Sequence, residues 1–437
     1  MAQNQQEIML TLDQHHALDA IVAFADGAGA SALMCLQGYA GTGKTTVVAH
    51  AVRELAGHGR RIAIAAPTNK AVGVLQEKIG EIEGVTFGSI HSFIGMRLRE
   101  NEDGTMSCWA DGIPSMHLYD LAVIDECSMI GTQLFSDIVM QRRSCRVLFV
   151  GDPAQLPPVG ERNDSPVFRH VANTVRLTRI VRQAQDNPII AASAAVREAI
   201  EDGRRVTIGD LVFPQPPSAA GVVSGGLSAI VDILVHEARA GRDCRALAWR
   251  NRRVADINAI VHDALHPSCR TPFAQGERVY ALAEFQASDA ESGASRRVFN
   301  SEELTVVGMD DDEHHGFAAW KTLLMREDGG IVCAYVPRKP DELRHHLTAL
   351  WAQYRAAKAK NEYAKARTLS ANAWALQRAF APIAHAYAMT VHKSQGSTFD
   401  TALIDWQDAS RQRDDYEFNR MIYVAMTRAA KHMAIVT

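Results

Sequence analysis

An octet close to the N-terminus constrains the fold more than any other stretch of the chain. Residues 38–45 read Gly-Tyr-Ala-Gly-Thr-Gly-Lys-Thr, which fits the pattern G-x-x-x-x-G-K-[ST] of a phosphate-binding loop. An apolar run at 32–36 precedes the octet, and a helix-forming run at 46–55 follows it. This order lets backbone N–H groups and the positive end of a helix hold phosphates. The octet predicts a nucleoside-triphosphate site; the alternative is a glycine-rich turn that ends in Lys-Thr.

Positions within the octet have separate expected roles. Lys44 is expected to reach the β- and γ-phosphates, and the Thr45 hydroxyl is expected to bind Mg²⁺. The predicted nucleotide contacts from the loop and the first helical turn are Gly38, Ala40, Gly41, Thr42, Gly43, Lys44, Thr45 and Thr46.

The composition excludes several classes of protein. The 437 residues carry a formal net charge of −4, so any surface that binds nucleic acid has to be local. The 7 cysteines are scattered without a C-x-x-C pair, which argues against zinc and disulfide frameworks and favours a reducing cytosol. No apolar run approaches the ~20 residues that span a bilayer, and residues 1–10 are too polar for a secretory signal. We therefore expect a cytoplasmic protein without a membrane partner.

The N-terminal part of the chain alternates short apolar runs with helical patterns up to about residue 183. The runs lie at 32–36, 61–66, 121–125 and 146–150, and each ends in a polar loop that carries glycine or proline. This alternation predicts a parallel sheet with crossover helices. Ligands of such sheets bind at the carboxyl ends of the strands, where these loops lie.

A second α/β unit is expected to start near residue 187 and to resume after residue 383. Two insertions interrupt the α/β pattern. Residues 94–118 contain Asp103-Gly104 between alternating segments, which predicts a β-hairpin. Residues 270–382 begin with short strand-like runs that suggest a small β-barrel, and they end in a helical segment at about 340–380.

Charge is concentrated in two places within the second insertion. Residues 338–380 hold nine Lys/Arg and three Asp/Glu, a local charge of +6. This helical arm is either a solvated amphipathic hairpin or an arm that contacts nucleic acid or the first hairpin. Residues 310–315 read Asp-Asp-Asp-Glu-His-His, and we interpret them as an exposed acidic loop rather than as a metal site.

Two carboxylates, Asp125 and Glu126, lie at the end of the run at 121–125. Asp125 is expected to hold Mg²⁺, directly or through water, and Glu126 is expected to polarise the attacking water as a general base. The sequence Gly-Asp-Pro-Ala-Gln-Leu-Pro-Pro-Val follows the next run at 151–159. Within it, Gln155 could hydrogen-bond the γ-phosphate or its water, and the prolines would stiffen the loop.

Arg182 and Arg428 are candidates for stabilising charge in the transition state, with surface salt bridges as the alternative. If Arg428 contacts the γ-phosphate, the nucleotide lies between the two α/β units. Gln14 precedes the first expected helix, and its amide could donate to and accept from an adenine edge.

Short polar side chains follow three further expected strands. They occur in Pro-Thr-Asn-Lys at 67–70, in Ser-Ile-His-Ser-Phe at 89–93 and in Thr-Val-His-Lys-Ser-Gln-Gly at 390–396. Hydroxyl, amide and imidazole groups on such loops bind phosphates without reading base sequence. A row of these loops across two units could follow a single strand of nucleic acid.

Taken together, these motifs resemble the superfamily 1 helicases, and among them the RecD-like, 5′-to-3′ translocating subgroup, with the Dda-type helicases as the nearest likeness. The resemblance covers nearly the whole chain in order. Its most specific segments are Asp-Glu-Cys-Ser-Met at 125–129, the segment at 151–159 and the segment at 390–396. The last motif in the order is Tyr-Val-Ala-Met-Thr-Arg-Ala at 423–429.

The resemblance implies an α/β fold with two RecA-like P-loop motor domains. The first motor domain would comprise residues 1–93 and 119–185, and the second 186–269 and 383–437. The first insertion, 94–118, would be a pin that splits a duplex, with Trp109 or Met106 as wedge; packing of Trp109 against its neighbours is the alternative. The second insertion, 270–382, would be an SH3-like β insertion with the helical arm.

The resemblance also implies ATP and Mg²⁺ as cofactors, and single-stranded DNA and single-strand/duplex junctions as partners. The resemblance adds three residues to the expected nucleotide contacts, namely Gln14, Gln395 and Gly396. The implied DNA contacts are Pro67, Thr68, Asn69, Lys70, Ser89, His91, Trp109, Asn251, Thr390, His392, Lys393 and Ser394. We expect an autonomous monomer in a bacterial or phage-infected cell, with possible contacts to a single-strand-binding protein or a replisome.

The chain departs from the family pattern at a few positions. Ser89 replaces a common Thr, Arg179 stands where an acidic residue is common, and Asn-Ser-Glu at 300–302 replaces an Asn-Gly-Glu turn. Two other functions stay open from the sequence. One is an RNA-directed or protein-displacing translocase, and the other is a nucleotide-gated assembly subunit with weak ATPase activity.

Overall fold

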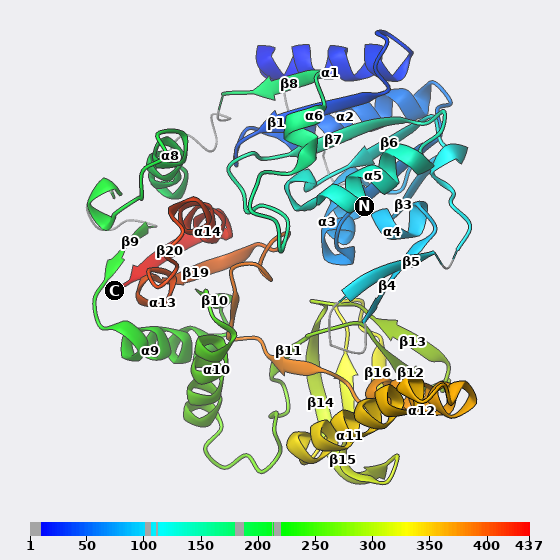
Figure 1. Cartoon of the computed structure of the whole chain (residues 1–437). Helices are drawn as coiled ribbons and strands as arrows, with labels where there is room; N and C mark the ends of the chain where they lie inside the picture. Colours follow the sequence, from blue (N-terminus) through cyan, green and yellow to red (C-terminus); the bar gives the residue numbers. More distant parts are fainter. Residues whose placement is uncertain (1–9, 101–105, 111, 180–187, 212, 214–219) are drawn as a thin grey trace. The chain divides into compact units, whose positions relative to one another are not determined.

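The computed structural model describes residues 10–100, 106–110, 112–179, 188–211, 213 and 220–437 (Figure 1). The chain forms two compact units. The first comprises residues 1–229, 247–250 and 390–437, and the second comprises residues 230–246 and 251–389. The expected division into two motor domains with two insertions stays a prediction. None of the helices in the described ranges has the length and apolar character that a bilayer crossing requires.

A six-stranded parallel sheet forms the N-terminal part of the first unit, as the alternating apolar runs predict. Its strand order is β3-β2-β6-β7-β1-β8. The strands are β1 (Leu33–Gly38), β2 (Ile62–Ala66), β3 (Val85–Ser89), β6 (Leu121–Ile124), β7 (Arg146–Gly151) and β8 (Thr174–Leu177). Strands β2, β6 and β7 are buried along almost their whole length, which explains their continuous apolar sequences.

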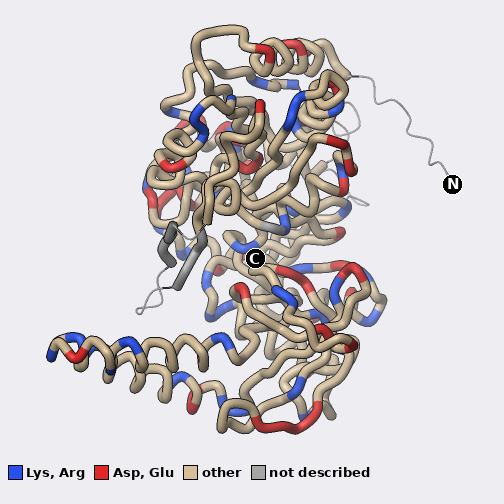
Figure 2. Tube along the Cα trace, turned by 90° about the vertical axis from the view of Figure 1, so that its right-hand side faces the viewer, with Lys and Arg blue, Asp and Glu red and all other residues tan. Residues whose placement is uncertain are grey.

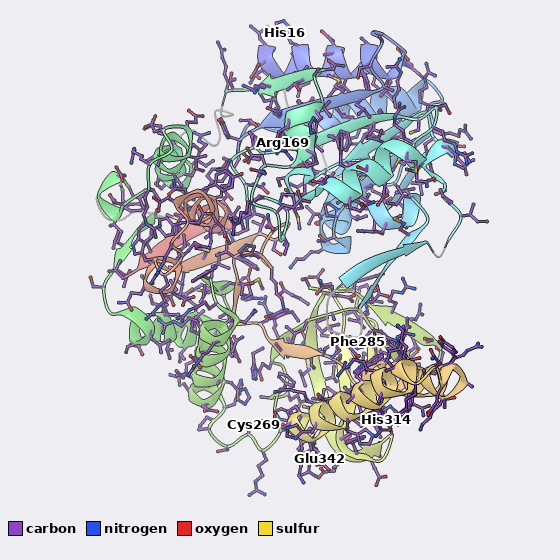
Figure 3. All side chains as sticks on the ribbon, in the orientation of Figure 1. His16, Arg169, Cys269, Phe285, His314 and Glu342 are labelled. Carbon is purple, nitrogen blue, oxygen red and sulfur yellow. The ribbon has the colours of Figure 1, made fainter. Side chains whose placement is uncertain are left out.

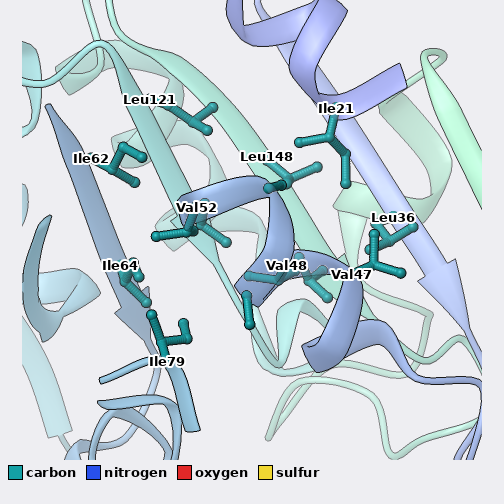
Figure 4. Close-up of a cluster of buried hydrophobic side chains, with 14 of the residues drawn as sticks. Ile21, Leu36, Val47, Val48, Val52, Ile62, Ile64, Ile79, Leu121 and Leu148 are labelled. Carbon is teal, nitrogen blue, oxygen red and sulfur yellow. The ribbon is translucent and has the colours of Figure 1, made fainter. Parts of the chain in front are cut away.

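Helices cover both faces of this sheet. One face packs against α1 (Leu12–Ala25), α2 (Lys44–Gly57) and α3 (Asn69–Ile79). Figure 4 shows the resulting core, where Val48 and Val52 of α2 lie among Ile64, Leu121 and Leu148 of the sheet. The opposite face packs against α4 (Ile90–Phe93), α5 (Thr132–Gln141) and α6 (Pro166–His170). Two short 3₁₀ helices, η1 (Met116–Leu118) and η2 (Cys127–Met129), lie in the connections.

A two-stranded antiparallel hairpin is inserted after α4. Strand β4 (Met96–Glu100) pairs with β5 (Met106–Ala110), with Met96 opposite Ala110 and Glu100 opposite Met106. The hairpin predicted from Asp103-Gly104 is therefore present, although its turn lies outside the described residues. Its identification as a pin stays a prediction.

A second sheet has the strand order β18-β10-β19-β20-β9. Its strands are β9 (Ala220–Val223), β10 (Cys244–Ala248), β18 (Ala388–Thr390), β19 (Phe399–Asp405) and β20 (Ala429–Val436). Strand β20 pairs in parallel with β19 and with β9. The helices of this region are α8 (Pro188–Glu201), α9 (Gly226–Arg239), α10 (Asn251–Leu265), α13 (Trp406–Ala409) and α14 (Asp415–Thr427), with η3 (Ile208–Asp210). Two parallel sheets with crossover helices confirm the predicted α/β class.

The second unit contains an antiparallel sheet with the strand order β13-β12-β16-β15-β14-β11-β17. Its strands are β11 (Arg278–Ala281), β12 (Phe285–Asp289), β13 (Ser295–Val298), β14 (Glu303–His314), β15 (Phe317–Met325), β16 (Ile331–Pro337) and β17 (Ile383–His385). The prediction of an acidic loop at 310–315 is wrong, because residues 310–314 are part of strand β14 and pair with β15. Their acidic side chains are exposed, as expected.

Helices α11 (Pro340–Ala359) and α12 (Tyr363–Ala379) form the predicted helical arm. The rings of Trp351 and Trp374 meet edge to face with centroids 5.3 Å apart, so the two helices pack as a hairpin. At the sheet, His314 stacks on Tyr335 with centroids 3.8 Å apart, and Figure 3 shows His314 close to the arm. Figure 2 shows Lys and Arg distributed along both helices.

Candidate nucleotide and nucleic-acid site

The strand order of the first sheet sorts the candidate residues into two groups. All six strands are parallel, so their carboxyl ends share one edge. The loops after β6, β7 and β1, which are consecutive in the sheet, carry the candidate nucleotide residues. The loops after β3 and β2, the next two strands along, carry candidate DNA residues. One continuous edge therefore presents both groups.

The phosphate-binding loop has the conformation that its glycines permit. Gly41 and Gly43 have φ values of 79° and 82°, in the left-handed region that glycine adopts without strain. At Gly38 a Cβ atom would lie 2.6 Å from the Thr42 Oγ1 atom and 3.2 Å from the Leu177 Cβ atom, so a larger residue would displace its neighbours. Helix α2 begins at Lys44, directly after this loop. The loop therefore directs the positive end of α2 towards the carboxyl edge of the sheet.

Lys44 lies across the loop rather than away from it. Its Nζ atom donates to the backbone oxygens of Gly38, at 2.6 Å, and Tyr39, at 3.1 Å. Thr45 and Thr46 are half-buried in the first turn of α2. The ammonium group is thus held at the loop by two backbone carbonyls, in the position from which it would meet a bound phosphate.

Asp125 and Glu126 follow β6 directly. The Asp125 Oδ1 atom accepts from the Glu126 backbone N–H at 2.8 Å. Burial and the neighbouring Glu126 charge raise the pKa of Asp125 to about 6. Glu126 has a φ of 53°, in the left-handed region that costs a residue with a side chain on the order of 1–3 kcal/mol. Backbone strain at the residue predicted as general base is typical of functional sites.

The loop after β7 is tied to the segment after β6. Gln155 is buried, and its Oε1 atom accepts from the Ser128 hydroxyl at 3.3 Å. Asp152 is fully buried, and its Oδ1 atom accepts from the Ala154 N–H at 2.9 Å. At Gly151 a Cβ atom would lie 2.5 Å from the Cys127 Sγ atom. These contacts fix Gln155 beside the segment that carries Glu126.

The Tyr423 hydroxyl connects three segments that are distant in sequence. It donates to Asp152 Oδ2 at 2.6 Å and accepts from the Ala40 backbone N–H of the phosphate-binding loop at 3.0 Å. Tyr423 is 1% exposed in α14. Sequence reasoning missed this residue. The available signal was a tyrosine within an apolar helix, since a buried tyrosine hydroxyl usually needs a partner.

A second connection joins α14 to the loop after β7. Arg420 is buried and contacts Asp164 at 2.9 Å, and Tyr416 also donates to Asp164. The Arg420 guanidinium lies over the Tyr416 ring, 3.9 Å from its centroid. Neither Arg420 nor Tyr416 was predicted as a site residue. Arg420 and Tyr416 lie on the turns of α14 that precede the motif at 423–429. Their contacts with Asp164 therefore hold this motif against the loop after β7.

Arg428 is buried at the end of α14. Its guanidinium donates to the backbone oxygens of Val424, at 3.2 Å, and Ser397, at 3.1 Å. Burial lowers the pKa of Arg428, and the charge of Glu126 acts in the opposite direction. The predicted contact of Arg428 with a γ-phosphate stays a prediction. Arg182 lies outside the described residues.

Gln14 has a structural environment close to the phosphate-binding loop. Its side chain is buried; Nε2 donates to the Thr42 backbone oxygen at 3.0 Å, and Oε1 accepts from the Thr11 N–H at 2.9 Å. Gln14 therefore fastens the start of α1 to the loop. Its expected contact with adenine stays a prediction.

The loops after β2 and after β18 meet. At Gly396, with a φ of 73°, a Cβ atom would lie 3.4 Å from the Ala71 Cβ atom and 3.7 Å from the Thr68 Oγ1 atom. The Lys70 Nζ atom lies over the Phe399 ring, 5.9 Å from its centroid. Two loops predicted to contact DNA, more than 300 residues apart, thus form one surface. Pro67 is half-buried there, and the Asn69 side chain lies outside the described residues.

The remaining polar loops hold their side chains through local hydrogen bonds. Ser89 caps α4, where its Oγ atom accepts from the Ser92 N–H at 3.2 Å. Burial lowers the pKa values of His91, His392 and Lys393, because it disfavours their charged forms. A phosphate placed beside these groups would act in the opposite direction and favour the protonated forms.

The segment at 390–396 combines internal and free donors. The Ser394 hydroxyl is fully buried and donates to the Val391 backbone oxygen at 2.7 Å, while Thr390 is buried and accepts from the Lys393 N–H at 3.4 Å. The Nε2 atom of the buried Gln395 has no partner among the described residues. A buried amide donor without a partner is suited to accept a ligand oxygen.

Two predicted DNA contacts are placed less fully. Asn251 is exposed at the first position of α10 in the second unit. Trp109 lies on β5, but its side chain lies outside the described residues. Their expected roles, like those of the other candidate site residues, stay predictions.

The residues present fit a nucleotide with Mg²⁺. The loop offers N–H donors and one ammonium group, the segment after β6 offers carboxylate oxygens, and Gln395 offers a free buried donor. Hard oxygen ligands such as the Thr45 hydroxyl and Asp125 are those that Mg²⁺ prefers. When bound, Mg²⁺ would neutralise phosphate charge at the carboxyl edge of the sheet.

Comparison with known proteins agrees with this geometry. A family described as an AAA domain matches residues 9–207, and one described as a UvrD-like helicase C-terminal domain matches residues 385–436. The ATP-dependent RecD2 DNA helicase of Deinococcus radiodurans is 35% identical over 167 residues, covering 37% of this chain and 21% of the relative. The ATP-dependent DNA helicase PIF3 of Trypanosoma brucei brucei is 31% identical over 170 residues, covering 36% and 19%. The chain thus spans about a fifth of the length of these relatives.

Solved structures with the same fold include two Pif1 helicases. The Bacteroides Pif1 helicase, in complex with ADP-AlF3 and single-stranded DNA, has a TM-score of 0.52 at 16% identity, over 98% of this chain and 92% of the other. The Candida albicans Pif1 helicase has the same TM-score and identity, over 98% and 94%. The expected likeness to Dda-type helicases stays a prediction. In its family matches, its relatives and its fold, the chain is thus similar to the superfamily 1 helicases of the RecD and Pif1 type.

Proposed function

We propose that this protein is an ATP-dependent DNA helicase that translocates 5′-to-3′ on single-stranded DNA and unwinds duplex DNA. The observation that carries the proposal is the single edge of the first sheet, where the loops after β6, β7 and β1 adjoin the loops after β2 and β3. A change at the nucleotide can therefore reach the DNA loops through neighbouring strands of one rigid sheet.

Each candidate residue has a defined role in this proposal. Lys44 binds the β- and γ-phosphates, Asp125 and Thr45 hold Mg²⁺, and Glu126 activates water. Gln155 senses the γ-phosphate, and Arg428 and Arg182 stabilise the charge that develops in the transition state.

On the nucleic-acid side, the loops at 67–70, 89–93 and 390–396 bind the phosphates of one DNA strand, and the β4–β5 hairpin separates the duplex. The contact of Gly396 with Thr68 and Ala71 supports a shared surface. The Bacteroides Pif1 helicase forms a complex with single-stranded DNA, which supports the same class of partner here. We expect a functional monomer, because one chain carries all the proposed catalytic residues.

Two measurements test the proposal. ATP hydrolysis should rise with added single-stranded DNA, and Lys44→Ala should abolish hydrolysis while the protein stays folded. The direction of translocation is tested by measuring the unwinding of two DNA substrates, one with only a 5′ overhang and one with only a 3′ overhang. Unwinding should require the 5′ overhang. An ATPase that ignores single-stranded DNA would refute the helicase, and unwinding from the 3′ overhang would refute the direction.

A further inference from the structure

Three metal-binding side chains meet in the second unit. His262 lies in the last turn of α10, and His266 follows four residues later, so both lie on the same side of the helix end. Glu277 directly precedes β11. One potential ligand atom from each of the three residues lies within 4.8 Å of the others. Among the residues that the structure describes, no other group of His, Cys, Asp and Glu meets this geometry, including the acidic segment at 310–315.

Glu277 is a buried carboxylate with an organised environment. Its side chain is fully buried, and its Oε2 atom accepts from the Ala274 N–H at 2.8 Å. The His262 Nδ1 atom lies 3.0 Å from Oε2, and the His385 Nδ1 atom lies 2.6 Å from Oε1. One backbone donor and two imidazoles therefore hold the Glu277 carboxylate in place beside the His262 ring.

A cavity of about 490 Å³ gives access to this cluster. His266 and Glu277 line it, together with Tyr387, whose hydroxyl lies 3.4 Å from the His266 Nε2 atom. An ion bound by the cluster would thus have an entry path and a position open to water. A site with three protein ligands and one open position is characteristic of exchangeable or catalytic zinc rather than of closed structural zinc.

We propose that His262, His266 and Glu277 bind a first-row transition metal ion, with Zn²⁺ as the preferred ion. Zn²⁺ binds imidazole nitrogen and carboxylate oxygen at about 2.0–2.2 Å, which separates neighbouring ligand atoms of a tetrahedral site by about 3.3 Å. The 3.0 Å between His262 Nδ1 and Glu277 Oε2 is close to that separation. Two imidazoles favour Zn²⁺ over Mg²⁺, which prefers oxygen ligands.

His385 completes the site as a positioning residue. It contacts the Glu277 oxygen that His262 approaches less closely, and such outer contacts orient a ligating carboxylate. The ion would join the end of α10 to the start of β11 within one unit, so binding should stabilise that unit. None of the residues assigned to nucleotide or DNA takes part, and the inference stands independently of the proposed function.

Cobalt binding to the full-length, tag-free, chelator-treated protein tests the site. Co²⁺ should give a saturable visible absorption band at one ion per chain, and Zn²⁺ should displace it. His266→Gln should weaken Co²⁺ binding at least ~10-fold, and so should His385→Asn if it positions Glu277. His345→Ala and His315→Ala remove exposed histidines and should leave binding unchanged. Absence of saturable binding would show that the cluster is only a hydrogen-bond network and would overturn the proposal.

Thermal unfolding separates loss of the site from loss of the fold. With chelator present, His266→Gln should unfold at the wild-type temperature, because His266 is only half-buried and its contact with the Tyr387 hydroxyl is long, at 3.4 Å. Added Zn²⁺ should raise the unfolding temperature of the wild type and of His345→Ala but not that of His266→Gln. Equal stabilisation of all three proteins would place the ion elsewhere and overturn the assignment.

Discussion

Tyr423 donates a 2.6 Å hydrogen bond to Asp152, and the same hydroxyl accepts the Ala40 N–H of the phosphate-binding loop. The two contacts join α14, the loop after β7 and the loop after β1 through one oxygen atom. Because the hydroxyl is buried, neither neighbour can turn to water when the contact is lost.

Tyr423→Phe should therefore lower both stability and turnover. Removing the hydroxyl leaves a buried carboxyl oxygen and a backbone N–H without this partner, a cost of about 1–3 kcal/mol. Urea unfolding measures the free energy, and steady-state ATPase assays measure the rate. Tyr363→Phe is the matched control, since Tyr363 is 68% exposed and its loss of a hydroxyl should change neither quantity. Wild-type stability and turnover in Tyr423→Phe would contradict the connection.

Asp125→Asn should make the protein more stable and inactive. Burial and the Glu126 charge raise the pKa of Asp125 to about 6, above its ordinary 3.8, so the folded state loses stability as the pH rises from about 4 to 6. Removing the carboxyl recovers up to about 3 kcal/mol at neutral pH, because one pKa unit is about 1.4 kcal/mol.

Urea unfolding in EDTA at pH 7.5 and at pH 4 checks this sign. The advantage of Asp125→Asn should be large at pH 7.5 and almost absent at pH 4. In the wild type at subsaturating Mg²⁺, the affinity for Mg²⁺ should fall as the pH drops through about 6, because protons compete with Mg²⁺ for the Asp125 carboxylate. A variant that is less stable than wild type at pH 7.5 would contradict the assigned pKa.

Glu126→Gln and Glu126→Gly should separate chemistry from backbone strain. Both remove the predicted base and should stop turnover while leaving ATP and DNA binding intact. Glycine adopts the observed φ of 53° without the cost that a side chain incurs, so the glycine variant should be about 1 kcal/mol more stable than the glutamine variant. Equal stabilities in urea would show that the conformation carries no strain, and residual turnover would remove Glu126 from the base role.

Trp109→Ala should lose duplex unwinding and keep DNA-stimulated ATPase. Trp109 lies on β5 of the inserted hairpin, and stacking of a base on an aromatic ring contributes ~1–3 kcal/mol. Trp109→Phe retains an aromatic ring and should preserve most of the unwinding. Parallel loss of ATPase and unwinding in Trp109→Ala would indicate a packing role instead.

The sequence predicted the parts of this molecule that depend on local pattern. The strands around the phosphate-binding loop, the hairpin at Asp103-Gly104 and the helical arm follow from apolar runs, turn residues and helical spacing. Prediction of a loop at 310–315 was wrong, because a charged run with exposed side chains can extend a hairpin when its partner strand supplies the backbone hydrogen bonds.

Long-range contacts of single atoms could not be predicted. The Tyr423 hydroxyl meets Asp152 across 271 positions, and no local pattern encodes such a pair. The left-handed backbone conformation at Glu126 could not be predicted from the sequence either, since glutamate has no preference for it. The cluster of His262, His266 and Glu277 could not be predicted, because helical spacing relates only the two histidines, whereas Glu277 lies just before the following strand.

The arm formed by α11 and α12 has entry and exit points that adjoin. The chain leaves the antiparallel sheet at the end of β16 and returns at Ala381, whose N–H donates to the Tyr335 backbone oxygen at 2.7 Å. Roughly forty residues therefore begin and end at one place on the sheet, so a gain or loss of whole helical turns alters reach and charge without a change of strand register. The length of the arm can therefore change while the sheet that carries it stays the same.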